Sequence, residues 1–290
     1  MITTKSEPSE HAMGPWSPRY VTDGPEKAGV WMHDGKLHDV DGPFVKNAPK
    51  FFDDPEWSLV REDGSVRYTN TREAFEAAAR PDVDPRYQNH VVEGDPSWYT
   101  DRFITTYIIP VQPRFARQTI PTPHAPVGVA FNGVKFDPPA PVEAILGAHT
   151  LAPLDDGGGH LNPFAGYHYH AATGHSKEVA QADGHAPMIG YAMDGFAIFA
   201  QLDEQGRAAE GLDEHGGHTD EVRGYHYHVG APGSNRILRT LRGVPGTIEM
   251  PSAPAAPGPG GPPDGRLQQQ THQHSHQHAH PHDSPARREH

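Results

Sequence analysis

The sequence LDDGGGHLNPFAGYHYH at residues 154–170 returns without a gap as LDEHGGHTDEVRGYHYH at residues 212–228. The two stretches share the leucine, the first aspartate, the Gly-Gly-His triplet and the closing Gly-Tyr-His-Tyr-His. Self-similarity at a fixed spacing is typical of one supersecondary unit that is used more than once. Two copies are too few for a solenoid, so the repeat predicts a pseudo-twofold arrangement around a shared core.

The closing pentapeptide places its histidines on one side of a strand. Side chains alternate between the two faces of a strand, so His168 and His170 point one way while Tyr167 and Tyr169 point the other. The same alternation holds at residues 225–228. We expect the tyrosines to pack in the core, and the paired imidazoles to converge on one ion.

A third histidine stands eight residues before the first strand histidine of each copy, at His160 and His218. It follows two glycines, which let the backbone bend sharply and bring the ring back toward the strand. Each copy thus supplies three nitrogens and leaves coordination positions for water or substrate. We expect Asp155 and Asp213 to accept a hydrogen bond from a ring N–H or to act as further ligands. The predicted ligands of the two copies are His160, His168, His170, His218, His226 and His228.

The same strands also have a purely structural interpretation. Half-buried histidines can be satisfied by hydrogen bonds alone, and a single His-x-His strand favours that reading. The duplication, with a third histidine at matching spacing, favours a metal site instead.

Composition narrows the classes of protein. The chain has 290 residues, 22 histidines and no cysteine, which excludes disulfides, thiolate zinc sites, iron–sulfur clusters and cysteine nucleophiles. A net charge of −13 without a basic cluster argues against nucleic acid and anionic membranes as partners and suits a cationic ligand. Without a signal-like N-terminus or a long apolar run, the sequence predicts a soluble cytoplasmic protein, although it leaves open a leader that has been removed.

The chain divides into four segments by composition. We expect a flexible arm at 1–20, a polar extension at 21–104 that packs on the core, a repeat-bearing domain at 105–247, and a disordered tail at 248–290. The tail combines a Pro/Gly linker with a His-x-His tract, which either gathers metal or is passive. Strand and turn signals dominate the third segment, so the predicted fold is mainly β, a sandwich or barrel-like domain with minor helical content.

Local signals within these segments are few but clear. The stretch NTREAFEAAARP at 70–81 predicts a helix capped by Thr71 and stopped by Pro81. Strands are expected within 103–111, 127–136 and 188–202, the second with a tight Asn-Gly turn.

Further stretches carry a family resemblance: YIIPVQP at 107–113, VGVAFNGVKFDP at 127–138 and HAPMIGYAMDGFAIF at 185–199. Together with the two repeats, they make residues 105–245 resemble the YHYH-domain family. The resemblance implies little about activity, because members are largely proteins of unknown function and are often secreted. Members often carry cysteine just before each Gly-Gly-His, where this chain has Gly157 and His215. The absence of both cysteines is consistent with a reducing compartment, and it makes His215 an additional candidate ligand.

The segment between the repeats offers two more candidates. His185 is a candidate ligand, and Asp194 is the first candidate for proton transfer in catalysis. Asp194 precedes a glycine and also fits an ordinary tight turn.

All-nitrogen ligation with carboxylates nearby favours copper, then zinc or iron, over magnesium or calcium. The sequence therefore predicts a metal-dependent enzyme that acts on a small molecule, by oxidation with O2 if the ion is copper or iron. A zinc ion would instead imply hydrolysis through an activated water. Two other classes stay open: a metal carrier or buffer without turnover, and a structural module without an ion. The sequence also leaves open the oligomeric state and whether the repeats share one ion.

Overall fold

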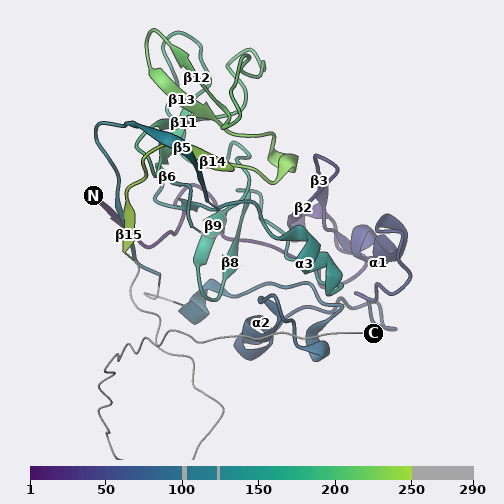
Figure 1. Ribbon diagram of the computed structural model, residues 1–290. Helices are drawn as coiled ribbons and strands as arrows, with labels where there is room; N and C mark the ends of the chain where they lie inside the picture. The colour runs from purple at the N-terminus through teal and green to yellow at the C-terminus, as the bar shows by residue number, and fades with distance from the viewer. Residues whose placement is uncertain (100–102, 123–124, 250–290) are drawn as a thin grey trace, which may run out of the picture. The chain divides into compact units, whose positions relative to one another are not determined.

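The main element of the protein is an eight-stranded mixed sheet, seen in a computed structural model that describes residues 1–99, 103–122 and 125–249 (Figure 1). Its strands are β6 (Gly128–Ala130), β7 (Lys135–Phe136), β8 (Gly159–Asn162), β9 (Gly166–Tyr169), β10 (Met188–Ala192), β11 (Ala197–Phe199), β12 (Gly217–Asp220) and β13 (Gly224–His228). The prediction of a mainly β protein with minor helical content is confirmed.

The strand order is β12-β13-β11-β10-β6-β7-β9-β8, and it has the same pairing pattern on both sides of its centre. The central pair β6–β10 is antiparallel. Outward from it, each half continues with an antiparallel hairpin, β6–β7 or β10–β11, and then a parallel neighbour, β9 or β13. Each half ends in an antiparallel edge strand, β8 or β12. The two histidine repeats therefore form the hairpins at opposite ends of one sheet.

Two tight turns close the inner hairpins. Gly133 and Gly195 have φ angles of 85° and 89°, a region that favours glycine, and each follows the turn residue Asn132 or Asp194. The Asn-Gly turn expected from the sequence is thus present, and Asp194 occupies the equivalent place in the second half.

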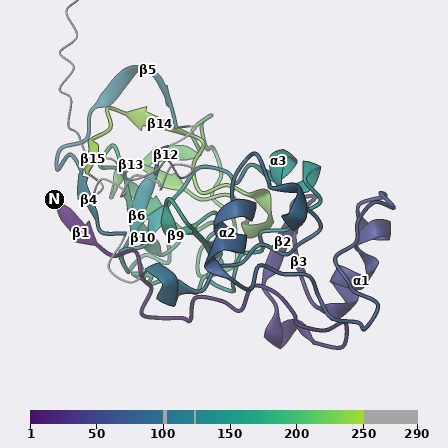
Figure 2. The same ribbon diagram turned by 90° about the horizontal axis from the view of Figure 1, so that it is seen from below.

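The N-terminal segment belongs to a separate three-stranded sheet rather than being the flexible arm that its composition suggests. Strand β1 (Ile2–Thr4) pairs with β4 (Thr105–Ile108), which also pairs with β15 (Thr247–Glu249) (Figure 2). Trp16 is buried in the main core. The sequence expectation failed here because the partner strand of β1 lies about a hundred residues further along the chain.

The remaining elements are short. The helices are α1 (Gly42–Phe51), α2 (Arg72–Ala78) and α3 (Val142–Gly147), with 3-10 turns at η1 (Pro25–Lys27), η2 (Pro85–Tyr87), η3 (Pro96–Tyr99) and η4 (Pro232–Ser234). Two antiparallel two-stranded sheets complete the fold: β2 (Val30–His33) with β3 (Lys36–Asp39), and β5 (Phe115–Pro121) with β14 (Thr240–Gly243).

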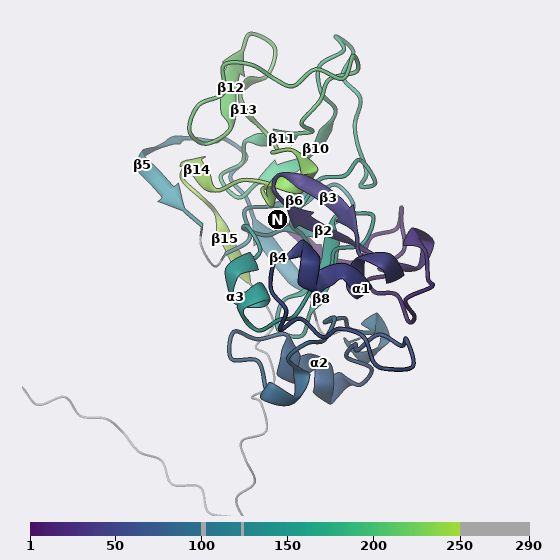
Figure 3. The ribbon, with the colours of Figure 1, turned by 90° about the vertical axis from the view of Figure 1, so that its right-hand side faces the viewer.

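Helix α2 follows its prediction, because the Thr71 hydroxyl accepts a hydrogen bond from the Ala74 N–H at 3.2 Å. Helix α1 was not expected. It begins at Asp41, whose carboxylate accepts a hydrogen bond from the Phe44 N–H at 2.8 Å. Figure 3 shows α2 and α3 near β8, where they help to form the site described below.

Residues Met1–Ala253 form one compact unit. Its main hydrophobic core lies on the sheet and includes Tyr107, Tyr169 and Tyr227, all fully buried. A second core surrounds α1 with Trp31 and Trp57. No helix among the described residues is long and apolar enough to cross a membrane. The predicted disordered tail lies, from residue 250 onward, outside the described residues.

Candidate metal centres

The first group of histidines is built on the β8–β9 hairpin. In this hairpin His160 lies directly opposite His168, and His170 follows on the same face of the strand. The ring centroids of the three are 4.7–5.1 Å apart. One nitrogen from each ring lies within 4.8 Å of the others, so the three form a group that could hold a metal ion. We call His160, His168 and His170 the first cluster.

The glycine pair that precedes His160 has the role expected from the sequence. Gly158 has a φ angle of 84°, and a Cβ there would lie 2.3 Å from the carbonyl oxygen of Ala171. A Cβ at Gly159 would lie 2.6 Å from the Tyr167 ring. Only glycines let the chain turn this closely against β9, and the turn brings His160 opposite His168.

A backbone carbonyl fixes the orientation of every ring in the first cluster. The Nδ1 atoms of His160, His168 and His170 lie 3.2, 2.9 and 2.7 Å from the carbonyl oxygens of Ala152, Gly166 and Pro138. A carbonyl only accepts hydrogen bonds, so each Nδ1 carries the proton and each Nε2 presents a lone pair. Carbonyl anchoring of this kind is typical of histidines that bind metal through the other nitrogen.

The free nitrogens face one another. Nε2 of His168 is 3.0 Å from Nε2 of His170, and the carbonyl bonds leave no proton to lie between them. Two ligands that are about 2.0–2.1 Å from one ion lie roughly 2.9–3.4 Å apart in octahedral or tetrahedral geometry. The spacing of the two lone pairs therefore fits a shared cation.

Burial keeps these imidazoles in the neutral form that binds metal. It lowers the pKa of His160 to about 3, and it holds the pKa of His168 well below its ordinary value. The pKa of His170 is also lowered by burial. A proton therefore competes weakly for these three nitrogens.

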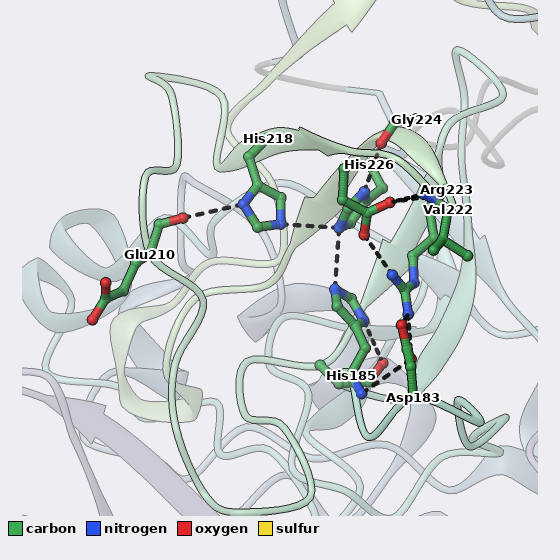
Figure 4. A network of polar contacts seen from close by, with 10 residues as sticks. Asp183, His185, Glu210, His218, Val222, Arg223, Gly224 and His226 are labelled. Carbon is green, nitrogen blue, oxygen red and sulfur yellow. Dashed lines mark hydrogen bonds and ion pairs between the residues drawn. The ribbon is translucent and has the colours of Figure 1, made fainter.

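The second group repeats this arrangement on the β12–β13 hairpin, with one more histidine. His218 lies opposite His226, and His228 follows on the strand. The fourth ring, His185, comes from the segment before β10, and Figure 4 shows it pointing at His226. Nε2 of His226 is 3.0 Å from Nε2 of His218 and 3.2 Å from Nε2 of His185. We call His185, His218, His226 and His228 the second cluster.

The second cluster is anchored in the same way as the first. The Nδ1 atoms of His218, His226 and His228 lie 3.1, 2.9 and 3.0 Å from the carbonyl oxygens of Glu210, Gly224 and Ala200. His185 Nδ1 lies 3.0 Å from its neighbour's carbonyl oxygen. The buried Nε2 of His228 has no hydrogen-bond partner within the described part of the chain. The sequence His-Ala-Pro that begins with His185 also occurs at 124–126, but residues 123–124 lie outside the described residues.

The clusters are well separated. Strands β9 and β13 are five interstrand steps apart in the main sheet. At the usual spacing between strands this amounts to roughly 24 Å along the sheet. Each cluster is therefore a separate candidate site, and the two cannot share an ion.

A cavity of about 440 Å³ opens onto the first cluster. All three histidines line it, and most of the remaining wall is apolar. The apolar wall comes from the end of α2, from α3, from β8 and from prolines 126, 138, 139 and 141, and it includes Ala78, Val92, Ile145 and Leu161. The cavity thus has the size and the apolar character of a small-molecule site.

Two charged residues stand beside the first cluster. The Asp137 carboxylate lies 3.8 Å from His168 Nε2 and 3.7 Å from the Lys135 ammonium. Lys135 is only 2% exposed, and both residues line the cavity. Burial lowers the pKa of Lys135, while the neighbouring Asp137 opposes that shift.

The second half of the sheet has apolar residues at these two places. Phe136 pairs with Tyr169 as Ile198 pairs with Tyr227, so Ala197 and Phe199 stand where Lys135 and Asp137 stand in the first half. A second cavity of about 500 Å³ touches only His185 of the second cluster, and its lining includes Glu178, Asp203 and Glu204. Among the described residues, the second cluster thus lacks the charged pair of the first, and the cavity at His185 is lined in part by carboxylates.

The carboxylates of the repeats bind tyrosines, which corrects the expectation that they would bind histidine N–H groups. The Tyr167 hydroxyl donates to the Asp155 carboxylate at 2.8 Å, and the Tyr225 hydroxyl donates to Asp213 at the same distance. Asp155 also accepts the N–H groups of Gly14, Gly157 and Gly159. These bonds lie on the face of the hairpins away from the histidines, where the tyrosines pack as expected.

Two other sequence candidates lie away from both clusters. Asp194 is fully buried and accepts hydrogen bonds from the Tyr227 hydroxyl and from the Gly243 N–H. Its contacts are those of a structural turn residue. His215 makes its ring contacts with the Thr240 hydroxyl and the Glu214 carboxylate instead. The structure thus joins seven of the eight predicted ligands into the two clusters and leaves His215 outside.

Sequence reasoning missed Lys135 and Asp137, although a signal for them exists. The repeat extends beyond its two most similar stretches: residues 128–138 align with 190–200 at a constant offset, pairing Gly128, Ala130 and Gly133 with Gly190, Ala192 and Gly195. In that alignment Lys135 and Asp137 are matched by the apolar residues Ala197 and Phe199, so the sequence shows that the two halves differ at these positions. A third group of possible ligands is partly exposed: His149 Nε2 lies 2.8 Å from the Asp54 carboxylate, with Glu56 nearby.

Comparison with known proteins gives one match. Residues 106–209 match the model of a family described as YHYH protein. The match contains the first of the two histidine hairpins and ends before the second. No curated protein and no solved structure matches the chain.

Proposed function

We propose, for a chain whose residues 106–209 match the YHYH protein family model, that it is a metalloenzyme whose catalytic transition-metal ion is held by His160, His168 and His170. One observation carries the proposal: three histidine rings, each held by a backbone carbonyl, bring their free Nε2 atoms together at the wall of an apolar cavity. The three nitrogens that the described residues supply leave coordination positions open, which is the arrangement of catalytic rather than structural sites. Its substrate is a small molecule that fits the cavity.

The choice of ion follows from the ligands. Neutral imidazoles suit copper, zinc and iron, and we place copper first because every ligand of the first cluster is a nitrogen. Bound copper or iron would supply one-electron and O2 chemistry. The chain's own contribution is to hold the three nitrogens in place through Ala152, Gly166 and Pro138, to exclude bulk water, and to orient the substrate against the apolar wall.

A second candidate function is favoured by Asp137. Its carboxylate lies 3.8 Å from a ligand nitrogen and lines the cavity, so it is within reach to accept a proton there. A zinc ion lowers the pKa of bound water, and a nearby carboxylate base then suits hydrolysis. This candidate uses the same three histidines with a different ion.

We propose a different role for the second cluster. Four histidines are the full ligand set of a tetrahedral structural site. They join the segment before β10 to both strands of the β12–β13 hairpin. An ion there would tie these segments together, and the cavity of about 500 Å³ nearby touches only His185 of the four.

The test measures turnover by protein that has been loaded with different metal ions. The chelator-treated chain would be loaded with copper, iron or zinc and assayed for O2 uptake with a panel of small aromatic and aliphatic compounds, and for hydrolysis of nitrophenyl esters. We expect O2 uptake with copper or iron, its loss in His168→Ala, and its retention in His175→Ala, which alters an exposed histidine outside both clusters. Ester hydrolysis by the zinc form alone would favour the second candidate. Rapidly exchanging metal without any turnover would contradict both and favour a carrier.

A further inference from the structure

The cavity beside the first cluster contains a charged group that its apolar walls do not explain. Lys135 lines the cavity, its side chain is almost fully buried, and burying a charge is costly unless the charge is paired and hydrogen-bonded. An ammonium group has three N–H donors to satisfy.

The neighbouring carboxylate does not satisfy these donors. Asp137 approaches the ammonium only to 3.7 Å, which is beyond hydrogen-bond distance. Its other oxygen, Oδ1, is buried without a hydrogen-bond partner among the described residues. The two groups thus lie close together, yet both keep hydrogen-bonding capacity for a molecule in the cavity.

The second half of the sheet provides an internal control. Ala197 and Phe199 occupy the equivalent positions, and β11 pairs with β13 there as β7 pairs with β9 in the first half. The fold of a half-sheet therefore does not require the charged pair. A buried ion pair is weak evidence for stability, so a ligand gives the better reason for its presence.

We propose that the cavity binds a small carboxylic acid with an apolar body, and that Lys135 holds its carboxylate. The apolar walls receive the body of the acid, and the ammonium group supplies charge-assisted hydrogen bonds to its carboxylate. A cavity of about 440 Å³ suits a single small organic molecule. Asp137 Oδ1 remains as an acceptor for a hydroxyl group on the same ligand. This inference rests on the proposed function, because it names the substrate class of that site.

The exposed rim of the cavity agrees with an anionic ligand. Arg80 lines the cavity and forms an exposed ion pair with Asp82. Arg80 and Lys135 thus place two basic groups at the cavity against the one carboxylate of Asp137, in a chain whose net charge is −13.

The experiment measures the affinity of full-length protein for matched acids and amides. Isothermal titration calorimetry would compare benzoate with benzamide and hexanoate with hexanamide, both after chelator treatment and after copper is restored. We expect each acid to bind at least tenfold more tightly than its amide. The preference should disappear in Lys135→Met and in Lys135→Ala, which copies the second half, and it should persist in Lys50→Met, which alters an exposed lysine. Asp137→Asn should strengthen binding of the acids.

Equal affinity for acid and amide in the unmodified protein would overturn the inference, and this measurement needs no variant to fold. A preference that survives in both Lys135 variants would overturn the role of Lys135. Acid binding that depends on Lys135 in the chelator-treated protein, together with no turnover in any metal form, would leave the inference standing while the proposed function fails. Turnover in a metal-loaded form, together with equal affinity for acid and amide, would support the proposed function and overturn the inference.

Discussion

At one end of the main sheet three histidines border an apolar cavity, whereas at the other end four histidines face one another. Both ends use the same hairpin, the same carbonyl-anchored rings and the same tyrosine–aspartate bonds on the opposite face. They differ in His185, which has no counterpart among the described residues of the first cluster, and in Lys135 and Asp137, which are replaced by Ala197 and Phe199. The repeated motif therefore fixes the positions of the facing histidine nitrogens, and the residues around these nitrogens differ between the two ends.

The largest expected effect is the loss of folding stability when chelator removes the ion of the second cluster. If the second cluster holds a structural ion, chelation should destabilise the protein by about 3 kcal/mol when free metal is near a hundred times the dissociation constant. Thermal melts with and without chelator should show this loss in the native chain and in His168→Ala. His226→Ala should show a clearly smaller loss, because Nε2 of His226 faces two other ligands of the second cluster and only the ion of the first cluster remains to be removed. The opposite pattern, with the effect lost in His168→Ala, would reverse the roles given to the two clusters.

A smaller difference is expected between the two tyrosine–aspartate pairs. Asp155 is fully buried and Tyr167 is 2% exposed, whereas Asp213 is exposed. Tyr167→Phe should lower the free energy of unfolding by about 2 kcal/mol, because it removes a bond to a buried carboxylate. Tyr225→Phe should cost less than about 1 kcal/mol, because water replaces the lost hydroxyl. Urea titrations of the two variants give the comparison, and equal costs would show that the two hairpins are buried to a similar degree in solution.

A further effect concerns pH. In the metal-free protein, burial lowers the pKa of His160 to about 3 and that of His228 to about 4, from an ordinary value of 6.5. Below pH 6.5 the unfolded chain binds protons that the folded chain does not, so stability should fall as pH falls. The loss continues to about pH 3 for His160 and to about pH 4 for His228.

The control for this pH dependence is substitution by glutamine, which does not titrate. His160→Gln should reduce the slope of stability against pH between 6.5 and 4, measured by urea titration in the presence of chelator. His175→Gln, which alters an exposed histidine, should leave the slope unchanged. A slope that stays the same in His160→Gln would mean that this ring is already protonated, or exposed, in the folded protein.

Much of each cluster is predictable from local sequence. Alternation along a strand places His168 and His170 on one face, and the glycines before His160 predict the bend that brings it opposite them. The turn at Asn132 and the cap at Thr71 are likewise encoded by adjacent residues. These features are local, so a single sequence reveals them.

Other features depend on contacts between distant parts of the chain. The position of β1 depends on β4, and the cavity depends on α2 and α3 meeting at β8. The separation of the two clusters depends on the strand order, which places β6, β7, β10 and β11 between them. The exclusion of His215 depends on Thr240, whose strand is reached only after the second repeat. No periodicity or spacing in the sequence contains this information.

The most direct test of the central claim is the number of metal ions bound by residues Met1–Ala253, the compact unit without the histidine tract of the tail. Elemental analysis after dialysis against a weak chelator should find two ions per chain in the native sequence. It should find one ion in His168→Ala, one in His226→Ala and none in the double variant. A folded native chain that holds no ion, or a single ion that either substitution removes, would contradict the account of two independent histidine centres.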